Sequence, residues 1–191
     1  FLAKIENHSN RLTFLIEDIL TLSRFESGGI GLELRHIDLG QLVDSVLDSL
    51  REMAGKKGVR LENDIGEKLS LFADSQRVFQ ALNNLVENGI KYGGECVCVS
   101  AKSDGSEIDL CVADDGPGIP AEACERIFER FYRVDKARSR EMGGTGLGLS
   151  IVKHVTQLHG GSARVESAPG EGASFHLTFP IPDKPVDTET G

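Results

Sequence analysis

Two hydrophobic periods alternate along this 191-residue chain, and their order constrains the fold more than any other feature. Stretches with apolar residues at every third or fourth position, typical of helices, alternate with stretches in which every second residue is apolar, typical of strands. One pair of strand-like stretches, 95–102 and 107–113, is joined through Asp104-Gly105, a dipeptide typical of tight hairpins. Helices mixed with antiparallel hairpins predict an α+β class, in the form of an α/β sandwich.

The pattern predicts four substantial helices, one short helix and about seven strands. The helices are expected at 1–27, 39–56, 75–92 and 147–159, with the short one at 121–128. The strands are expected at 32–37, 59–65, 69–73, 95–102, 107–113, 162–167 and 173–180. We expect Asp38 and Asp74 to cap the second and third helices, and a turn at Gly66 to join the two strands beside it. Residues 133–144 are uneven and charged, and the polar end of the chain is expected to fray.

Composition excludes several classes of protein. With 21 Lys and Arg against 30 Asp and Glu, the net charge is −9, which argues against non-specific nucleic-acid binding. Hydrophobic residues make up 39% and charged residues 27%, a balance typical of soluble globular domains rather than disordered chains. No apolar run approaches the roughly 20 residues of a membrane span. Charges spread through the first 22 residues argue against a signal peptide.

The four cysteines show no CxxC pair and no histidine at a zinc-like spacing. We therefore expect buried, reduced thiols, with a metal site or a disulfide as the alternatives. The cysteines are Cys96, Cys98, Cys111 and Cys124.

The third predicted helix carries a polar stripe. Asn84, Asn88 and Lys91 are spaced so that they share one helix face, and Tyr92 continues it. One interpretation is a solvated face, because two carboxamides, an ammonium group and a phenol are poor core material. The other is a row that holds a metal ion and phosphate oxygens, since Asn offers a hard oxygen ligand for Mg²⁺ and Lys a point charge for phosphate.

A cluster of acidic residues, glycines and prolines, 114–120, follows a predicted strand. Gly116, Gly118 and Ala121 match a Gly-x-Gly-x-x-Ala dinucleotide fingerprint, but a proline crowds the helix start and no parallel strand follows within a βαβ unit. A carboxylate at a strand end, beside glycines that let a ring approach, can accept a hydrogen bond from an exocyclic amine. Asp114 is therefore a candidate acceptor for the amine of adenine.

More glycines precede the last predicted helix, in the segment 143–149. No Gly-Lys-Ser/Thr follows, so this is not a Walker A loop. The segment still offers several backbone N–H groups at a helix N-terminus, an arrangement that suits phosphate. A flexible linker is the alternative, but Ile151, Val152 and Val155 enter a buried-type stripe immediately afterwards, which disfavours it.

Aromatic and arginine residues alternate in Ile127–Arg133. The aromatic residues fit an ordinary core. Arg130 and Arg133 are candidates for stabilising phosphate charge, because a guanidinium group can bind two oxygens at once. Surface salt bridges explain these arginines equally well.

Taken in order, these segments resemble the ATP-binding catalytic domain of sensor histidine kinases from two-component systems. Residues 84–92 look like the N box of that family, 114–118 like the G1 box, 127–133 like the F box and 144–149 like the G2 box. The resemblance covers nearly all of residues 1–182. It implies a Bergerat-type fold, in which helices cover one face of a mixed sheet and one long helix precedes it.

The resemblance also implies a division of the chain into three parts. Residues 1–28 would be the second helix of a dimerisation and phosphoacceptor hairpin, 29–182 the ATP-binding catalytic domain, and 183–191 a flexible tail. Residues 133–144 would form a mobile lid over ATP. The full-length protein would be a homodimer with a response regulator as partner, and this chain a cytoplasmic domain of a membrane-associated bacterial sensor without nucleic-acid or membrane contacts of its own.

Site residues carry over from the family by position. The implied catalytic residues are Asn84, Asn88, Lys91 and Arg133. The implied contacts of ATP and Mg²⁺ are Asn88, Lys91, Tyr92, Asp114, Gly116, Gly118, Ile119, Gly144, Thr145, Gly146, Leu147 and Gly148. Among them, Asn88 would ligate Mg²⁺ and Asp114 would bind the adenine amine. The reaction would move the γ-phosphoryl group of ATP onto a histidine, mostly by positioning and charge neutralisation.

One departure from the family pattern stands out. The family's acceptor histidine lies in a His-Glu-like box on the first hairpin helix, and this sequence has no such box. His8 lies on what resembles the second hairpin helix and is expected to be an ordinary surface residue. We therefore expect this chain to bind ATP without phosphorylating itself.

Two rival functions remain open. Related ATPases and serine-kinase anti-sigma factors share the ATP fold, but the ATPases place a glutamate base four residues before the metal-binding Asn, where this chain has Asn84. Glu87 directly precedes Asn88 and points about 100° away from it around a helix with 3.6 residues per turn. The other rival is a non-catalytic module that signals by contacts, which predicts a degraded nucleotide site.

Overall fold

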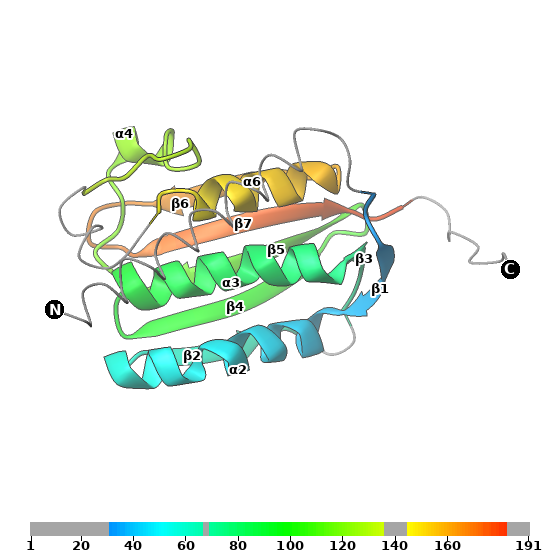
Figure 1. Cartoon of the computed structure of the whole chain (residues 1–191), viewed down its shortest axis with the longest axis horizontal. Coiled ribbons are helices and arrows are strands. Elements are labelled where there is room, and N and C mark those ends of the chain that lie inside the picture. Colours follow the sequence, from blue (N-terminus) through cyan, green and yellow to red (C-terminus); the bar gives the residue numbers. More distant parts are fainter. Residues whose placement is uncertain (1–30, 67–68, 136–144, 183–191) are drawn as a thin grey trace, which may run out of the picture.

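The computed structural model describes residues 31–66, 69–135 and 145–182. In these residues a five-stranded sheet forms one layer, and three long helices packed side by side form the other (Figure 1). This two-layer arrangement confirms the predicted α/β sandwich. The helix expected at 1–27, the tail expected at 183–191 and most of the lid segment lie outside the described residues.

The sheet is mixed, with the order β2-β4-β5-β7-β6. Strand β2 runs parallel to β4, and the other neighbouring strands pair antiparallel. The bounds are β2 Arg60–Asp64, β4 Cys96–Ser103, β5 Glu107–Asp114, β6 Ala163–Ser167 and β7 Ala173–Pro180. The β4–β5 hairpin turns at Asp104, whose Oδ1 accepts hydrogen bonds from the backbone N–H groups of Ser106 (2.8 Å) and Glu107 (3.0 Å), as the sequence predicts.

A second, two-stranded sheet accompanies the main one. The strands predicted on either side of Gly66 are present, but they do not pair with each other. β3 (Ser70–Asp74) pairs antiparallel with β1 (Leu34–Asp38), while β2 joins the main sheet. The two strands differ in burial. Leu71 and Ala73 of β3 are buried, whereas β2 is exposed along most of its length and lies at the edge of the main sheet.

Three helices cover one face of the main sheet: α2 (Leu39–Lys57), α3 (Ser75–Tyr92) and α6 (Gly148–Leu158). The two predicted caps are confirmed. The Asp38 side chain accepts from the backbone N–H of Gln41, and the Asp74 side chain accepts from those of Gln76 and Arg77. The short helix α4 covers only Ala121–Cys124 rather than 121–128.

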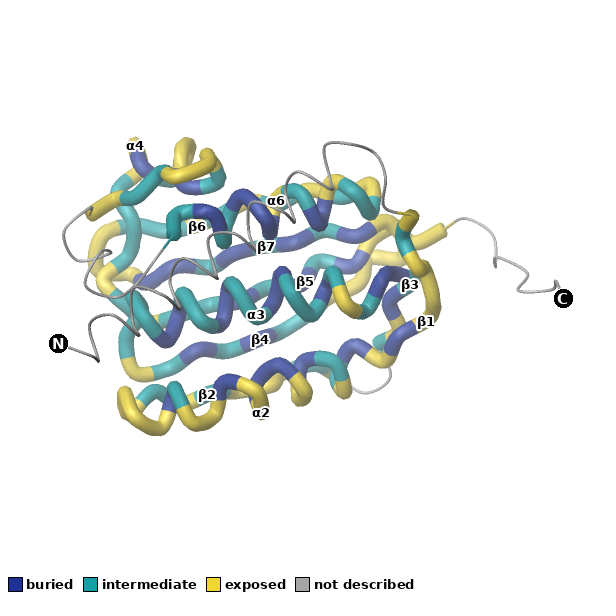
Figure 2. The backbone as a smooth tube through the Cα atoms, viewed as in Figure 1, coloured by how far each residue is buried: buried dark blue, intermediate teal, exposed yellow. Residues whose placement is uncertain are grey.

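The hydrophobic core lies between the helices and the sheet, where buried residues of both layers meet (Figure 2). Alternate residues of the central strands point into it, including Val97 and Val99 of β4 and Leu110 and Val112 of β5. Full burial of such a side chain contributes about 1.5–3 kcal/mol, so this layer contact dominates the stability of the domain. None of the described helices contains a hydrophobic stretch of the length that a bilayer requires.

Candidate functional site

Glycines let the C-terminal end of α3 meet the loop after β5. A Cβ atom added to Gly93 would lie 2.9 Å from the Cβ of Asp114, and one added to Gly116 would overlap the backbone of Gly93. Such distances leave no room for side chains. The contact therefore brings the helix with the polar stripe and the strand-end carboxylate to the same end of the sheet.

Asp114 ends β5 and sits in register between Val97 of β4 and Ala173 of β7. Its Oδ1 accepts a hydrogen bond from the backbone N–H of Gly116 at 2.9 Å. Burial raises the pKa of this carboxyl above its ordinary value. The hydrogen bond from Gly116 lowers the pKa in part, and repulsion by Asp115 raises it further. Within the described segments, no protein donor reaches the other oxygen, so it suits a ligand N–H group.

Asp115, the next residue, makes hydrogen bonds to the protein backbone instead. Its Oδ1 accepts hydrogen bonds from the backbone N–H groups of Glu95 (2.7 Å) and Cys96 (2.8 Å), which ties it to the connection between α3 and β4. These bonds, that of Cys96 foremost, lower the pKa of Asp115. Its carboxylate thus holds the backbone of the site rather than a ligand. Its role was missed by the sequence analysis.

The polar stripe lies on α3 as predicted, and Asn84 and Asn88 are half-buried there. Lys91 Nζ lies 2.7 Å from Glu87 Oε1, in a partly buried ion pair within the helix. Glu87 is therefore engaged with Lys91. This contact disfavours Glu87 as a base that activates water beside Asn88.

The start of α6 meets this stripe. A Cβ added to Gly148 would lie 3.3 Å from Oδ1 of Asn84. Leu147, at the N-cap position, makes no side-chain capping bond, while its own N–H donates to Thr145 Oγ1 at 3.2 Å. The N–H groups of the first turn of α6 are thus free of a side-chain cap and are suited to an anion.

The aromatic and arginine segment contacts the same glycine-rich stretch. The N–H of Phe131 donates to the carbonyl of Gly146 at 2.8 Å, and a Cβ added to Gly146 would lie 3.4 Å from Nε of Arg133. Phe131 has φ +62°, a left-handed conformation that strains a bulky residue, and 61% of it is exposed. The exposure of Phe131 corrects the expectation that the aromatic residues of this segment all belong to the core.

The structure therefore joins all four sequence motifs at one end of the sheet, through contacts at Gly93, Gly116, Gly146 and Gly148. Predicted residues Tyr92, Ile119 and Leu147 belong to the same joined segments, whereas Gly144 lies outside the described residues. Gly118, with φ +73°, has no room for a side chain because Ala168 lies against it. The loop that contains Ala168 was missed as part of the site, and no local sequence signal marks it.

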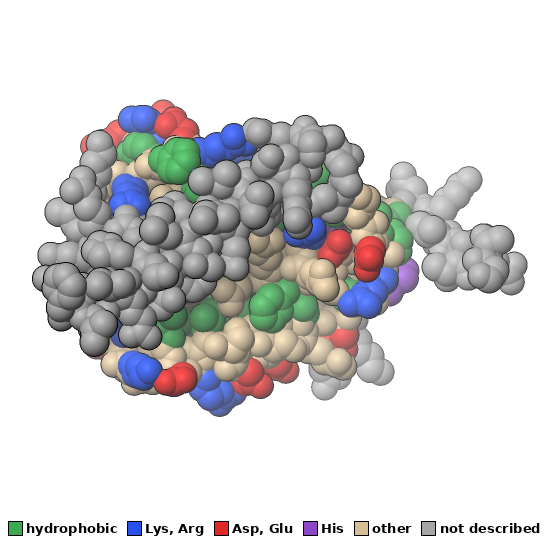
Figure 3. Space-filling view, viewed as in Figure 1, with side chains coloured by type: hydrophobic (Ala, Val, Ile, Leu, Met, Phe, Trp, Pro, Cys, Tyr) green, Lys and Arg blue, Asp and Glu red, His purple; other side chains and the backbone are tan. Residues whose placement is uncertain are grey.

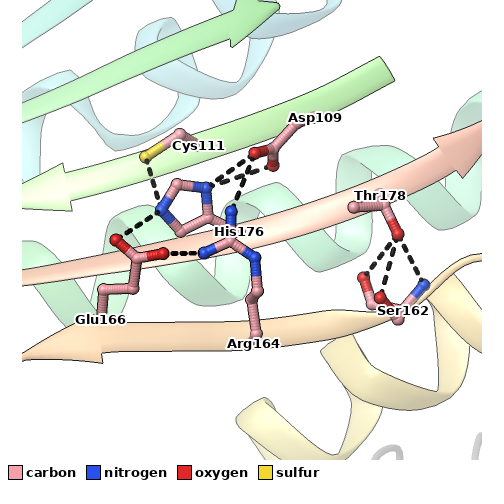
Figure 4. A network of polar contacts seen from close by, with 7 residues as sticks. All are labelled: Asp109, Cys111, Ser162, Arg164, Glu166, His176 and Thr178. Atoms are coloured by element: carbon pink, nitrogen blue, oxygen red, sulfur yellow. Dashed lines mark hydrogen bonds and ion pairs between the residues drawn. The ribbon is translucent and has the colours of Figure 1, made fainter. Parts of the chain in front are cut away.

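A second polar cluster lies on the opposite face of the sheet (Figure 4). His176 on β7 places Nδ1 3.0 Å from Asp109 Oδ2 and Nε2 3.9 Å from the thiol of Cys111, both on β5. Arg164 and Glu166 of β6 complete the network through ion pairs with Asp109 and with each other. The arrangement superficially matches a thiol, base and carboxylate relay.

The chemistry of this cluster points to a structural network. Burial, more than the neighbouring Asp109, raises the pKa of the Cys111 thiol, which disfavours a reactive thiolate. Among the described residues, no three His, Cys, Asp or Glu side chains come close enough to hold a metal ion. All four cysteines are free but only half-buried, which corrects the expectation of buried thiols. They are more exposed because one sheet face has no covering helix among the described residues, and because Cys124 lies on the short outer helix.

Comparison with known families agrees with this geometry. Residues 73–183, more than half of the chain, match the family described as histidine kinase-, DNA gyrase B- and HSP90-like ATPases. The chain belongs to this family of ATP-binding domains. The matched region includes α3, the loop after β5 and the start of α6, which are the segments joined at the site.

Within the family, the relatives are sensor histidine kinases. The chain is 37% identical over 182 residues to the sensor-like histidine kinase SenX3 of Mycobacterium tuberculosis, covering 94% of this chain and 44% of the relative. It is 34% identical to the sensor histidine kinase WalK of Bacillus subtilis, covering 98% of this chain and 31% of the relative. The chain thus spans less than half the length of these relatives, and it is the ATP-binding domain of the histidine kinase type.

Solved structures show the same fold. Full-length ShkA in complex with AMPPNP matches with a TM-score of 0.80 and 30% identity, over 93% of this chain and 36% of that one. The nucleotide-free catalytic domain of the histidine kinase ThkA matches with a TM-score of 0.68 and 30% identity, over 78% of this chain and 95% of that one.

Proposed function

We propose that this chain is the catalytic part of a sensor histidine kinase, which transfers the γ-phosphoryl group of ATP to a histidine on a hairpin helix. Onward transfer to an aspartate of a response regulator, dimerisation of the full-length protein and a cytoplasmic position in a membrane-associated sensor belong to the same proposal. The observation that carries it is the meeting of the four motif segments at one end of the sheet, with an acceptor carboxylate at Asp114 and an uncapped helix start at Gly148.

Recognition of adenine falls to Asp114 in this proposal. One carboxylate oxygen is oriented by Gly116, which leaves the other to accept from the exocyclic amine of the base. Gly116 and Gly118 let the ring approach, with Tyr92 and Ile119 packing beside it. A base with a carbonyl oxygen at that position would place two acceptors against each other, so the site should prefer adenine.

The triphosphate would lie between the α3 stripe and the start of α6. Backbone N–H groups of the stretch from Gly144 to Gly148 would hold its oxygens, and Lys91 and Arg133 would neutralise charge. Lys91 would exchange its contact with Glu87 for one with phosphate. Phosphoryl transfer needs little more than such positioning and charge stabilisation.

The residues present also fit a magnesium ion. The carboxamide oxygen of Asn88 is a hard ligand that suits Mg²⁺, and the side chain is half-buried on α3. Asn84 would support it from one turn earlier. A bound Mg²⁺ would neutralise charge on the phosphates, while Asn88 would fix the position of the complex.

Two rivals are less well supported. A water-activating ATPase needs a free base beside the metal ligand, and Glu87 is instead paired with Lys91 at 2.7 Å. A non-catalytic module predicts degraded motifs, whereas Asn88, Asp114 and the glycines between the motifs are all present.

Nucleotide binding tests the proposal directly. We expect calorimetry to show binding of a non-hydrolysable ATP analogue that is strengthened by Mg²⁺, and loss of that binding in Asp114→Asn, because the Asn amide can donate where an acceptor is needed. Glu122→Gln, an acidic residue changed in the short helix α4, is the control and should bind like the wild type. Unchanged affinity in Asp114→Asn would refute the adenine assignment.

Phosphoryl transfer needs a second assay. The chain, labelled ATP and a separate hairpin segment bearing an acceptor histidine are mixed, and the label on the segment is tested for loss in acid and retention in base. Such a label supports a histidine kinase. Release of inorganic phosphate at the same rate with and without the segment would favour an ATPase instead.

A further inference from the structure

The turn between β6 and β7 packs directly against the loop that follows Asp114. The N–H of Gly170 donates to the carbonyl of Pro117 at 2.7 Å. A Cβ added to Gly172, which has φ +73°, would overlap the carbonyl oxygen of Asp114. Segments more than 50 residues apart in sequence are therefore in backbone contact at the site.

Ser167, the last residue of β6, links this turn to the loop. Its hydroxyl accepts a hydrogen bond from the N–H of Ile119 at 2.9 Å and donates one to the carbonyl of Gly172. One half-buried hydroxyl thus provides hydrogen-bond partners for two backbone groups, the N–H of Ile119 and the carbonyl of Gly172.

The loop from Asp114 to Ile119 is consequently fixed at both ends. Strand pairing with Ala173 fixes Asp114, and Ser167 fixes Ile119. Between these two points lies Gly116, whose N–H orients the Asp114 carboxylate. Ser167 also bonds to Gly172, in the same turn that holds Pro117 through Gly170, so loss of its hydroxyl would loosen both contacts and let Gly116 and the carboxylate move.

We propose that Ser167 is a positioning residue for adenine recognition: its hydroxyl holds the loop in the shape that aims Asp114 at the exocyclic amine. This inference rests on the proposed nucleotide-binding function and assigns a specific part of it. Ser167 does not have to touch the nucleotide, and it acts through Ile119 and Gly116.

The test separates the amine contact from the rest of nucleotide binding. Affinities are measured by calorimetry for ADP and for the matching purine riboside diphosphate, which has hydrogen in place of the 6-amino group. The wild type should prefer ADP by roughly ten-fold or more, as expected for a hydrogen bond to a charged acceptor. Ser167→Ala should weaken ADP by about ten-fold and the analogue far less, so that the preference shrinks.

Two further variants show whether the hydroxyl is responsible. Ser167→Thr keeps a hydroxyl and should restore most of the preference for ADP. Ser162→Ala is the matched control, because Ser162 precedes the other end of β6, where its hydroxyl contacts Thr178 Oγ1 at 3.0 Å. It should leave both affinities unchanged. Ser167→Cys, similar in size but weak in hydrogen bonding, carries the same test if the alanine variant does not fold.

The outcomes are distinct. The proposal is overturned if Ser167→Ala keeps the wild-type preference, if it weakens ADP and the analogue equally, or if Ser162→Ala behaves in the same way. Failure of the wild type to bind ADP would instead remove the proposed function, and the role of Ser167 with it.

Discussion

Asp114 and Asp115 show how two identical neighbouring residues acquire opposite properties. Asp114 points toward the helices, where burial raises its pKa, whereas Asp115 accepts two backbone hydrogen bonds that lower its pKa. A buried carboxylate with a raised pKa is typical of functional positions, and one held by backbone donors is typical of structural ones. In the proposed function, the pair therefore divides ligand recognition and backbone support between adjacent residues.

This difference predicts opposite effects on stability. Asp115→Asn should be less stable than the wild type at neutral pH, because an ionised Asp115 is favoured in the folded state. Its contribution is present above the unfolded pKa, about 3.9, and is lost as the pH falls through the lower folded pKa. Urea unfolding at pH 7 and pH 3 should show the difference shrinking in acid.

Asp114→Asn is the matched control, with the reverse sign. The folded pKa of Asp114 is raised, so ionisation costs stability as the pH rises from the unfolded value through the folded one. Without ligand, the Asp114→Asn variant should therefore be at least as stable as the wild type at pH 7. In acid, where Asp114 is protonated, the substitution should bring no gain in stability. Equal pH profiles for the two variants would contradict the assigned environments.

The sequence points to Asp114 as a candidate site residue but not to Asp115 or Ser167, and the reason is physical. A carboxylate beside glycines at a strand end is a local pattern, so Asp114 can be recognised. The partners of Asp115 and Ser167 lie 19 and 48 residues away in sequence, and only the packed fold brings them within hydrogen-bond distance. Neither residue type carries a signal for such a role.

At the scale of elements, Gly89 sets how closely α3 approaches the sheet. It is buried in the helix, and a Cβ added there would lie 2.7 Å from Cγ2 of Val97 on β4. Since Asn88 precedes Gly89 and Asp114 pairs with Val97, this contact also sets the spacing between the two halves of the site.

Gly89→Ala is expected to destabilise the domain by about 1–3 kcal/mol, because overpacking against a central strand outweighs the better helix propensity of Ala. The free energy of unfolding is measured in urea. Adding Val97→Ala should recover part of the overpacking loss, which a double-mutant cycle detects as a coupling between the two positions.

Gly55→Ala in α2 is the control, since no atom lies within 4 Å of a Cβ added there. It should stabilise the domain by up to about 1 kcal/mol, because Ala favours a helix more than Gly does. Similar effects of both substitutions would show that the contact with Val97 does not limit the approach of α3.

Element positions were largely predictable from the sequence, whereas strand partners were not. Asp74 and the apolar period predicted helix 75–92, and alternation predicted strand 173–180 with the bounds observed. The pairing of β2 with β4 depends on which strand has free backbone groups beside β2 in the folded domain. The hydrophobic pattern within a single strand does not specify this partner. The short helix ends early because the backbone after Cys124 continues in turns, in which the N–H of Arg126 donates to the carbonyl of Ala123 and that of Glu129 to the carbonyl of Arg126.

At the scale of the whole molecule, the described part of the chain is one-sided. Helices cover one face of the sheet, and the network around His176 lies on the other (Figure 1, Figure 4). In the space-filling view, charged side chains lie mostly toward the edges of the described surface, with hydrophobic side chains and other atoms between them (Figure 3). Stability therefore rests on one hydrophobic layer and on hydrogen-bonded strands, without covalent cross-links among the described residues.

Because all four cysteines are free, a reductant should leave the thermal unfolding midpoint unchanged. Scanning calorimetry with and without dithiothreitol checks this, and mass spectrometry after alkylation of the denatured chain should find four modified cysteines. A midpoint that falls in reductant, or fewer than four accessible thiols, would reveal a disulfide.

The place of β7 has a consequence for synthesis on the ribosome. This strand is the last of those described, yet it lies between β5 and β6, so Asp114 obtains its neighbour Ala173 only after the 58 residues that follow it have been translated. A nascent chain that ends within α6 still lacks the strand that pairs with Asp114. If the proposed function holds, we expect nucleotide to bind tightly only once β7 has joined the sheet, so that it stabilises the folded domain rather than an early folding intermediate.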